Sequence, residues 1–178
     1  MTLVSGEAFG DLFRSFERTA FRLEPRERYN SPGEQEPLRR FLAGEPDDLG
    51  WNRPWLDLMA EHAAKRKFVH RVRVVSVPLS EYSRFGLWCA QFALQAGEDI
   101  RYLDRARAQG LPQDDYWLFD SKWAAVLRFD DDDVLLGAEI VTDPATVAEL
   151  AAGRDDAWHR AVTRDQFLAS LAGSRAPE

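Results

Sequence analysis

The chain has 178 residues, of which 45% are hydrophobic and 30% charged, and its formal net charge is −7. This is the composition of a globular protein, and its 12% of aromatic residues exclude a disordered chain. The net negative charge argues against direct nucleic-acid binding by the surface as a whole. The opening residues lack a signal-peptide pattern and no apolar run of about 20 residues follows. We therefore expect a cytoplasmic protein without membrane contact.

The first third of the chain reads as helical. A helix is expected to begin after Ser5 and to end before Pro25, because apolar residues recur along it at helical spacing: Phe9, Leu12, Phe13, Phe16 and Ala20. Residues 24–33 read as a loop. A short helix over 34–43 follows, with Leu38, Phe41 and Leu42 expected to face inward. Asn52 is expected to cap a further helix that ends in the basic residues 65–67.

The middle of the chain reads mainly as strands. Residues 70–77 are rich in β-branched side chains and predict the clearest strand. Ser80 is expected to cap a helix that ends at Gly97, and residues 98–103 predict a second strand. Three strands follow over residues 115–120, 123–129 and 134–141, and their short connections favour an antiparallel arrangement.

Two helical segments are predicted at the end of the chain. Asp143 and Pro144 begin the first, which Gly153 is expected to break. Thr163 and Gln166 have the spacing of a capping box that begins the last helix. This helix is expected to end near residue 172.

These elements predict an α+β fold in one domain over residues 1–178. A mixed, mainly antiparallel sheet of about four or five strands (68–141) would be flanked by N-terminal helices (5–67) and C-terminal helices (143–172). The β-α-β arrangement near residue 70 allows one parallel pair of strands.

Arg71 and Arg73 are the leading candidates for a binding site. Two positions apart on a strand, their side chains share one face of the sheet, and two guanidinium groups can bind a carboxylate or a phosphate. The alternatives are a solvated sheet face or ion pairs with Glu98 and Asp99 on a neighbouring strand. Arg101, on that same strand, is a third candidate ligand for an anion.

Further candidates lie on loops and strand ends. Glu24, Arg26 and Tyr29 belong to the loop at Pro25, where functional residues often lie but where charged residues are also common for solubility. Asp115 begins a short strand, and Tyr82 and Trp117 are candidate aromatic walls of a ligand pocket. Glu98 and Asp99 open the strand over 98–103, and either carboxyl group would be able to act as an acid or base if burial raised its pKa. Neutralisation by the nearby arginines is the alternative.

No motif for a metal, a cofactor or a catalytic group stands out. The only cysteine, Cys89, has apolar neighbours and reads as a buried thiol. The acidic residues 130–133 lack the ligand pattern of a calcium loop and read as a solvated turn. His62, His70 and His159 do not have the spacing of a helical metal site, and there is no nucleophile elbow or phosphate-binding glycine loop. We expect no cofactor, no metal and no catalytic residue.

Several long segments resemble an actinobacterial family of uncharacterised proteins, domain of unknown function 6879. They are residues 23–29 (LEPRERY), 36–49 (EPLRRFLAGEPDDL), 71–82 (RVRVVSVPLSEY), 96–101 (AGEDIR), 111–112 (LP), 115–120 (DYWLFD) and 137–144 (GAEIVTDP). Genes of this family often lie beside helix-turn-helix regulators. The resemblance therefore implies a regulatory role and a helix-turn-helix protein as a partner.

A weaker likeness concerns the fold. A β-α-β unit followed by an antiparallel meander is similar to half of a phospholipase D-like domain. Asp115 and Trp117 stand where that superfamily has its His-x-Lys motif, and this implies a degenerate version that binds without phosphodiesterase chemistry.

Three functions are consistent with the sequence. The one we favour is a non-catalytic binding or regulatory module that recognises an anionic ligand or a protein partner. The alternative is a hydrolase acting on a phosphorylated or nucleotide-like substrate, with Glu24, Glu98, Asp99 or Asp115 as base or metal ligand. A third is an oligomeric scaffold with Trp51 and Trp55 as exposed contact points.

Overall fold

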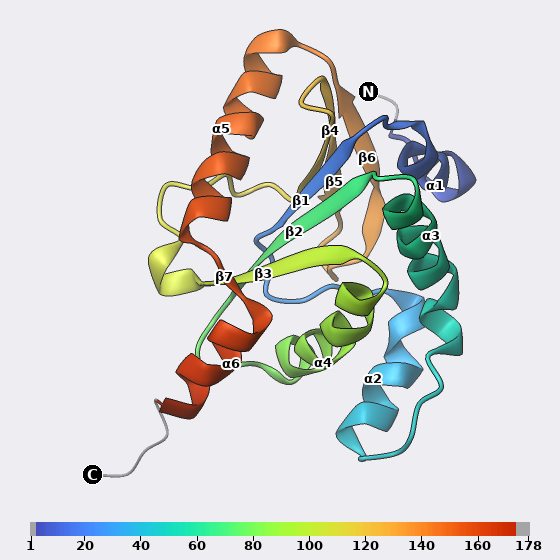
Figure 1. Cartoon of the computed structure of the whole chain (residues 1–178), viewed down its shortest axis with the longest axis vertical. Coiled ribbons are helices and arrows are strands. Elements are labelled where there is room, and N and C mark those ends of the chain that lie inside the picture. The colour runs from blue at the N-terminus through green and yellow to red at the C-terminus, as the bar shows by residue number, and fades with distance from the viewer. Residues whose placement is uncertain (1–2, 174–178) are drawn as a thin grey trace.

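One sheet of seven strands runs through the part of the chain that the computed structural model describes, residues 3–173 (Figure 1). The strands lie in the order β6-β5-β4-β1-β2-β3-β7. Their bounds are β1 Thr19–Glu24, β2 Phe68–Val75, β3 Glu98–Asp104, β4 Tyr116–Phe119, β5 Trp123–Phe129, β6 Leu135–Val141 and β7 Val162–Thr163. The mixed sheet in an α+β fold is confirmed, but the expected four or five strands are too few.

The sheet has a parallel centre and antiparallel flanks. Strand β2 pairs in parallel with both β1 and β3. The remaining pairs, β1 with β4, β4 with β5, β5 with β6 and β3 with β7, are antiparallel. The β-α-β unit from β2 to β3 was predicted, whereas the second parallel pair, between β1 and β2, was not.

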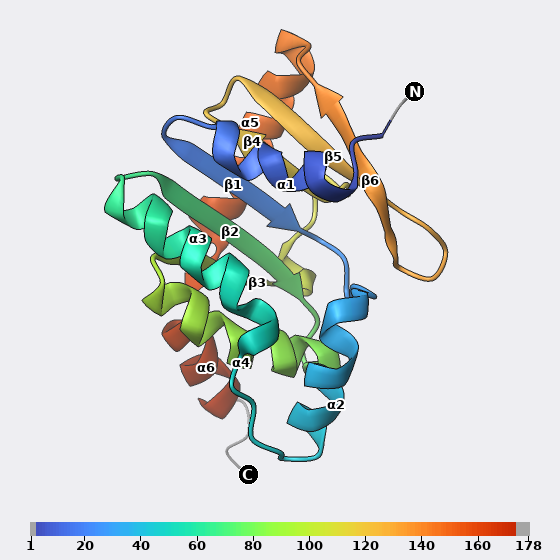
Figure 2. The same cartoon turned by 90° about the vertical axis from the view of Figure 1, so that its right-hand side faces the viewer.

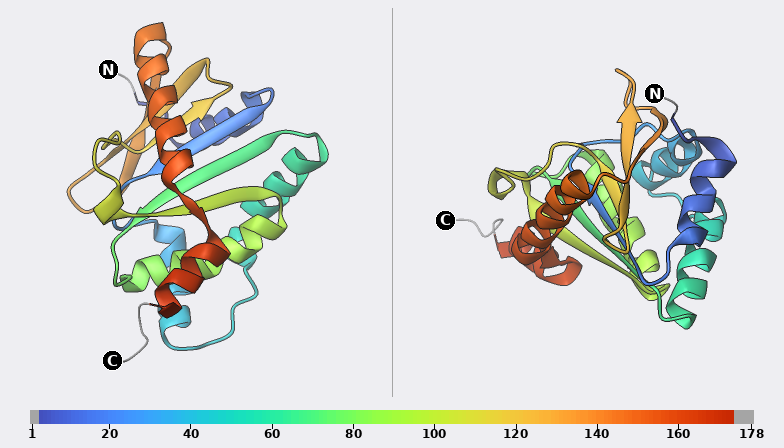
Figure 3. Two further views of the ribbon diagram at one scale, coloured as in Figure 1. Left: turned by 60° about the vertical axis from the view of Figure 1, so that its left-hand side comes forward. Right: turned by 90° about the horizontal axis from the view of Figure 1, so that it is seen from above.

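The helices form a layer on each side of the sheet. Figure 2 shows α1 and α3 in front of the sheet with α5 behind it, and the view from above in Figure 3 shows the sheet between the two layers. The α-helices are α1 Gly6–Ser15, α2 Gln35–Leu42, α3 Arg53–Ala64, α4 Glu81–Gln95, α5 Pro144–Arg160 and α6 Arg164–Gly173. Short 3-10 helices cover Pro32–Glu34, Gly50–Asn52 and Arg105–Arg107.

The three helix starts predicted from the capping residues Ser80, Asp143 and Thr163 are confirmed. The Ser80 hydroxyl accepts a hydrogen bond from the Ser83 backbone N–H at 3.1 Å and begins α4. Asp143 accepts from the Thr146 N–H at 2.9 Å and begins α5. The remaining cap is reciprocal, because the side chains of Thr163 and Gln166 each accept from the other residue's backbone N–H, as a capping box requires.

Strand β1 is the main difference from the sequence-based prediction, which placed a helix there. The helix α1 ends at Ser15, and Phe16 already has extended backbone angles. The Asp120 carboxylate then accepts hydrogen bonds from the backbone N–H groups of three successive residues: Glu17, Arg18 and Thr19. A side chain more than 100 residues away in the sequence therefore fixes the turn into β1, and helical spacing of apolar residues does not reveal it.

Two further local predictions are wrong. Gly153 does not break α5, which continues to Arg160. Leu42 at the end of α2 is exposed rather than turned inward.

The strands of the sheet centre present different residues to its two faces. On the α5 face, a closed apolar core includes Phe21, Leu23, Val72 and Val74. The alternate positions of the same strands, among them Arg22, Glu24, Arg71 and Arg73, point to the face covered by α1, α3 and α4. The candidate site lies on this second face.

Candidate functional site

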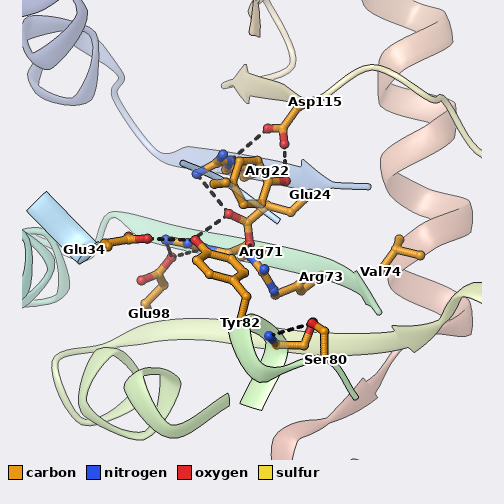
Figure 4. A network of polar contacts seen from close by, with 12 residues as sticks. Arg22, Glu24, Glu34, Arg71, Arg73, Val74, Ser80, Tyr82, Glu98 and Asp115 are labelled. Carbon is orange, nitrogen blue, oxygen red and sulfur yellow. Dashed lines mark hydrogen bonds and ion pairs between the residues drawn. The ribbon is translucent and has the colours of Figure 1, made fainter. Parts of the chain in front are cut away.

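A cavity of about 750 Å³ lies between the sheet and the helices α1, α3 and α4. Its floor is formed by one face of β1, β2, β3 and β4. Apolar side chains of the helices line the opposite wall, among them Phe13, Leu58, Phe85 and Ala93. Charged side chains cover the floor, and Figure 4 shows how they converge.

The sheet register brings three arginines together. Arg22 of β1 lies directly beside Arg71 of β2, and Glu24 lies beside Arg73. On the other side of Arg22 the register places Trp117 of β4. Because neighbouring like charges repel across a sheet, this arrangement needs compensating groups.

Glu24 supplies much of that compensation. Its Oε1 atom lies 3.0 Å from Nη1 of Arg22 and 3.2 Å from Nη1 of Arg71, and its Oε2 atom lies 3.3 Å from Nη1 of Arg73. Burial alone would raise the pKa of this carboxyl group, but the three guanidinium groups lower the pKa of Glu24 to about 2. Glu24 is therefore ionised at neutral pH and holds the three arginines in place.

Glu98 neutralises the second arginine. Its Oε1 atom accepts hydrogen bonds from both Nε (2.9 Å) and Nη2 (2.6 Å) of Arg71. Its Oε2 atom accepts from the indole N–H of Trp55 at 3.1 Å. The ion pair between Arg71 and the neighbouring strand, one of the expected alternatives, is thus present with Glu98. It leaves Arg71 with little capacity to bind a further ligand.

Asp115 pairs with the third arginine. Its Oδ1 atom accepts from Nε of Arg22 at 3.0 Å, and its Oδ2 atom accepts from the Tyr29 hydroxyl. Burial raises the pKa of the Asp115 carboxyl group above its ordinary value in spite of Arg22. Asp115 does not line the large cavity but lines a smaller one of about 180 Å³.

Aromatic rings alternate with the guanidinium groups and complete the site. The Arg71 guanidinium carbon lies 5.7 Å from the ring centroid of Trp55 and 5.8 Å from that of Trp117. The Arg22 carbon lies 5.6 Å from Trp117 and 5.3 Å from Tyr29. These are cation–π distances.

The alternation continues to the third arginine, whose guanidinium carbon lies 5.2 Å from the centroids of both Tyr29 and Tyr82. We call this alternating series of four rings and three guanidinium groups the arginine ladder: Trp55, Arg71, Trp117, Arg22, Tyr29, Arg73 and Tyr82.

Arg73 is the least satisfied member of the arginine ladder. Its Nη1 atom bonds Glu24, but its Nε and Nη2 atoms are buried and have no hydrogen-bond partner among residues 3–173. The side chain is only 7% exposed. Two other buried donors that line the cavity, the Tyr102 hydroxyl and the Trp51 indole N–H, also lack a partner in the described residues. The cavity is therefore lined by several buried donors that have no partner in the described residues.

One carboxyl group at the cavity has no cationic partner. Glu34, which ends the first 3-10 helix, accepts a hydrogen bond from the Tyr82 hydroxyl at 2.7 Å through Oε2. No lysine, arginine or histidine nitrogen among residues 3–173 lies within 4.0 Å of its carboxylate. Burial raises the pKa of Glu34.

The structure brings together most of the candidates named from the sequence. Seven of them line the cavity and Asp115 adjoins it; the seven are Glu24, Tyr29, Arg71, Arg73, Tyr82, Glu98 and Trp117. Arg26 lines only the smaller cavity, together with Asp115, and pairs with Asp133. Asp99 and Arg101 point to the opposite face of the sheet, where Arg101 lies 3.8 Å from the ring centroid of Trp158.

Five residues of the site were not among the ligand-binding candidates: Arg22, Glu34, Trp51, Trp55 and Tyr102. Arg22 was assigned to a helix, although its i, i+2 spacing to Glu24 is that of a strand face. Tyr102 lies two positions after Ile100 on β3, so the two side chains share the face of the strand that lines the cavity. Glu34 ends a 3-10 helix and Trp55 lies on α3. No pattern in the neighbouring sequence shows that these two elements pack over the sheet. Trp51 and Trp55 are also not exposed contact points: Trp51 stacks on Phe85, and Trp55 packs edge-on against Phe13.

Other charged groups serve the fold. Asp133, expected in a solvated turn, forms ion pairs with Arg26 and Arg28 and is therefore not simply solvated.

Burial raises the pKa of the Cys89 thiol to about 12, so it stays protonated at neutral pH. Within residues 3–173 no three histidine, cysteine or acidic side chains are grouped as a metal site would need. No helix in that range is both long and apolar enough to cross a bilayer.

Comparison with known proteins identifies the family. A search of curated proteins finds no match. The family described as "Domain of unknown function (DUF6879)" matches residues 7–169, which include every strand of the sheet and all residues of the arginine ladder. The chain belongs to the DUF6879 family.

Proposed function

We propose that this protein is a binding module that recognises a small anionic ligand in the cavity above the arginine ladder. The observation behind the proposal is the buried Arg73 guanidinium group, whose Nε and Nη2 atoms lack partners among residues 3–173. These two N–H groups form the edge that binds carboxylates and phosphates in a bidentate manner. A buried donor without a partner is costly, so a partner supplied by a ligand would stabilise the protein.

The remaining cavity fits this proposal. Its volume lies within the range of small-molecule sites, which are mostly apolar with a few placed polar groups. The unpartnered donors of Tyr102 and Trp51 suit a ligand rich in acceptor oxygens. Because Glu24, Glu98 and Asp115 already hold Arg22 and Arg71, the site is preorganised before a ligand enters.

Thermal unfolding and calorimetry with phosphate, citrate and 3-phenylpropionate test the proposal. At least one of these anions is expected to raise the melting temperature of the wild type. Arg73→Lys, which keeps the charge but loses the bidentate edge, is expected to weaken that anion's binding about tenfold or more. Arg101→Gln is the matched control, because Arg101 lies on the adjacent strand and faces α5. No binding by the wild type, or equal losses in both variants, would overturn the proposal.

A hydrolase acting on a phosphorylated or nucleotide-like substrate is the second candidate function. One observation favours it: the buried Asp115 carboxyl has a raised pKa, accepts a hydrogen bond from Tyr29 and is linked through Arg22 to Glu24. A raised pKa is what a general acid or base needs at neutral pH. Release of p-nitrophenol from p-nitrophenyl phosphate or its diester, lost in Asp115→Asn, would support this function. Absence of release by the wild type would count against it.

A helix-turn-helix regulator as a partner, a location in the cytosol and the likeness to a degenerate phospholipase D-like fold remain predictions. The partner is tested by purifying a tagged chain from its native cells and identifying the proteins that copurify. If ligand binding is regulatory, the amount of copurified regulator should change when the anion that binds in calorimetry is added.

A further inference from the structure

Glu34, which is half-buried, differs from the buried carboxyl groups around the cavity. Glu24, Glu98 and Asp115 each lie within 3.3 Å of at least one arginine nitrogen. Glu34 has only the Tyr82 hydroxyl as a hydrogen-bond donor, and no cation lies within 4.0 Å of it in the described residues. The cavity thus has an anion without a cation, just as Arg73 is a cation with an unused edge.

Tyr82 lies between these two groups. One face of its ring lies 5.2 Å from the Arg73 guanidinium carbon, and its hydroxyl reaches Oε2 of Glu34 at 2.7 Å. Tyr82 therefore contacts both groups. Figure 4 shows Arg73 and Glu34 on opposite sides of Tyr82. Arg73 and Glu34 line the same cavity but do not form a direct ion pair, so a small molecule in the cavity is able to contact both.

The wall opposite the sheet determines what else the molecule would contact. This wall presents apolar surface to the cavity through Phe13, Leu58, Phe85 and Ala93. Trp51 also lines the cavity and stacks on Phe85. A ligand made only of charged groups would leave this surface in contact with water. An apolar or aromatic body attached to the charged groups would cover it.

We infer that the ligand is a zwitterion of the amino-acid type, with an anionic group at Arg73, an ammonium group at Glu34 and an apolar or aromatic body against the helices. The inference rests on the proposed function, because the anionic group binds at the same arginine. It adds a cationic group to the ligand and assigns Glu34 as the residue that selects for it. Placing a cation at Glu34 and an anion at Arg73 matches the charge pattern of the cavity, which is how binding sites gain specificity.

Calorimetry with three related probes tests the inference: L-phenylalanine, 3-phenylpropionate, which lacks the ammonium group, and phenethylamine, which lacks the carboxylate. The wild type is expected to bind L-phenylalanine at least about tenfold more tightly than either analogue, since each analogue lacks one charge-assisted contact. Equal affinity for L-phenylalanine and 3-phenylpropionate would overturn the inference and leave the anion site intact. Binding of none of the three, with phosphate or citrate bound, would also overturn it.

Glu34→Gln provides the second arm. The amide oxygen still accepts the Tyr82 hydrogen bond, so the fold around the site is retained while the negative charge is lost. The variant is expected to bind L-phenylalanine no more tightly than 3-phenylpropionate and to bind 3-phenylpropionate at least as well as the wild type does. Glu36→Gln, an exposed glutamate on α2, is the matched control and should preserve the preference. A preference for L-phenylalanine that survives in Glu34→Gln would contradict the role of Glu34.

Discussion

The two faces of the central sheet are built from alternate residues of the same strands, yet they differ in chemistry. In β1, Phe21 and Leu23 enter the closed core beneath α5, whereas Arg22 and Glu24 enter the cavity beneath α1, α3 and α4. In β2, Val72 and Val74 contrast in the same way with Arg71 and Arg73. Apolar burial on the first face stabilises the fold, because it removes hydrocarbon surface from water.

The polar face is stabilised in a different way. Buried ion pairs contribute little net stability, because desolvation offsets most of their attraction. Removal of one partner is nevertheless expensive, since it leaves the others buried and unpaired. Both faces bury hydrophobic side chains, but only the polar face also contains buried charges, which must be complete for that face to be stable. Mutations that distinguish the two faces test this view.

Glu24→Ala is expected to have the largest effect, a loss of about 3–5 kcal/mol in the free energy of unfolding, because it leaves three guanidinium groups without their shared carboxylate. Leu23→Ala, at the neighbouring position on the other face, is the matched control. It should also destabilise the fold, by about 2–5 kcal/mol, but through a cavity in the core. Urea denaturation measures both losses, and a Glu24→Ala variant as stable as the wild type would show that the arginines need no such compensation.

Of the two faces of the sheet, the polar one should be the more sensitive to acid, because it contains the buried Glu24 carboxylate. Glu24 has a pKa of about 2 in the folded protein against 4.5 in the unfolded chain, so its stabilisation is present above pH 4.5 and is lost as the pH falls towards 2. The difference corresponds to about 3 kcal/mol. The raised pKa of Asp115 acts in the opposite direction, because protonation of that group favours the folded state.

The measurement is the free energy of unfolding as a function of pH in three proteins. Leu23→Ala should follow the wild-type profile at a lower stability. Glu24→Gln should have a flatter profile between pH 4.5 and 2, since it has no carboxyl group to protonate at this position. Parallel profiles for the wild type and Glu24→Gln would mean that other carboxyl groups dominate the acid response.

Local patterns in the sequence predicted those elements whose signals lie within the element. The strand β2, the helix α4 with its Ser80 cap and the meander β4–β6 all have short-range periodicity or capping residues. β1 was missed because it is central and buried on both faces, so Ala20, Phe21 and Leu23 do not show a strict alternation. Its start is set by Asp120, which only the folded chain brings into contact.

The candidate site was predictable in part for the same reason. Arg71 and Arg73 were found because their spacing on an obvious strand defines a face. Arg22, at the equivalent position on β1, was lost with its strand. Arg101 was grouped with them by chemistry, but register places it beside Val72 on the opposite face. The presence of an arginine alone therefore does not show which arginines converge. What decides it is whether their positions in the paired strands place the side chains on the same face of the sheet.

Glycines in the two covering helices extend the comparison from the strands to the helices. Gly153 lies within α5, on the apolar side, and a Cβ atom there would lie 2.6 Å from Cγ of Pro112 and 2.8 Å from its Cδ. The proline ring has little freedom to move away. Gly153→Ala should therefore destabilise the protein by about 1–3 kcal/mol through overpacking, in spite of the better helix propensity of alanine. An increase in the melting temperature of this variant would show that the Pro112 loop yields.

Gly86 occupies the corresponding position on the polar side, within α4 and against Arg73. A Cβ atom there would lie 3.7 Å from Nε and 3.8 Å from Cζ of Arg73, which is ordinary van der Waals contact. Alanine therefore fits, and it removes the conformational entropy that glycine costs in a helix interior. Gly86→Ala should raise the free energy of unfolding by about 0.5–1 kcal/mol, opposite in sign to Gly153→Ala. Gly86→Leu is the control, because a longer side chain would displace the guanidinium group from Tyr29 and Tyr82 and should lower both stability and anion affinity. If Gly86→Ala were destabilising, α4 and Arg73 would be packed as closely as α5 and Pro112, and the polar face would be as closed as the apolar one.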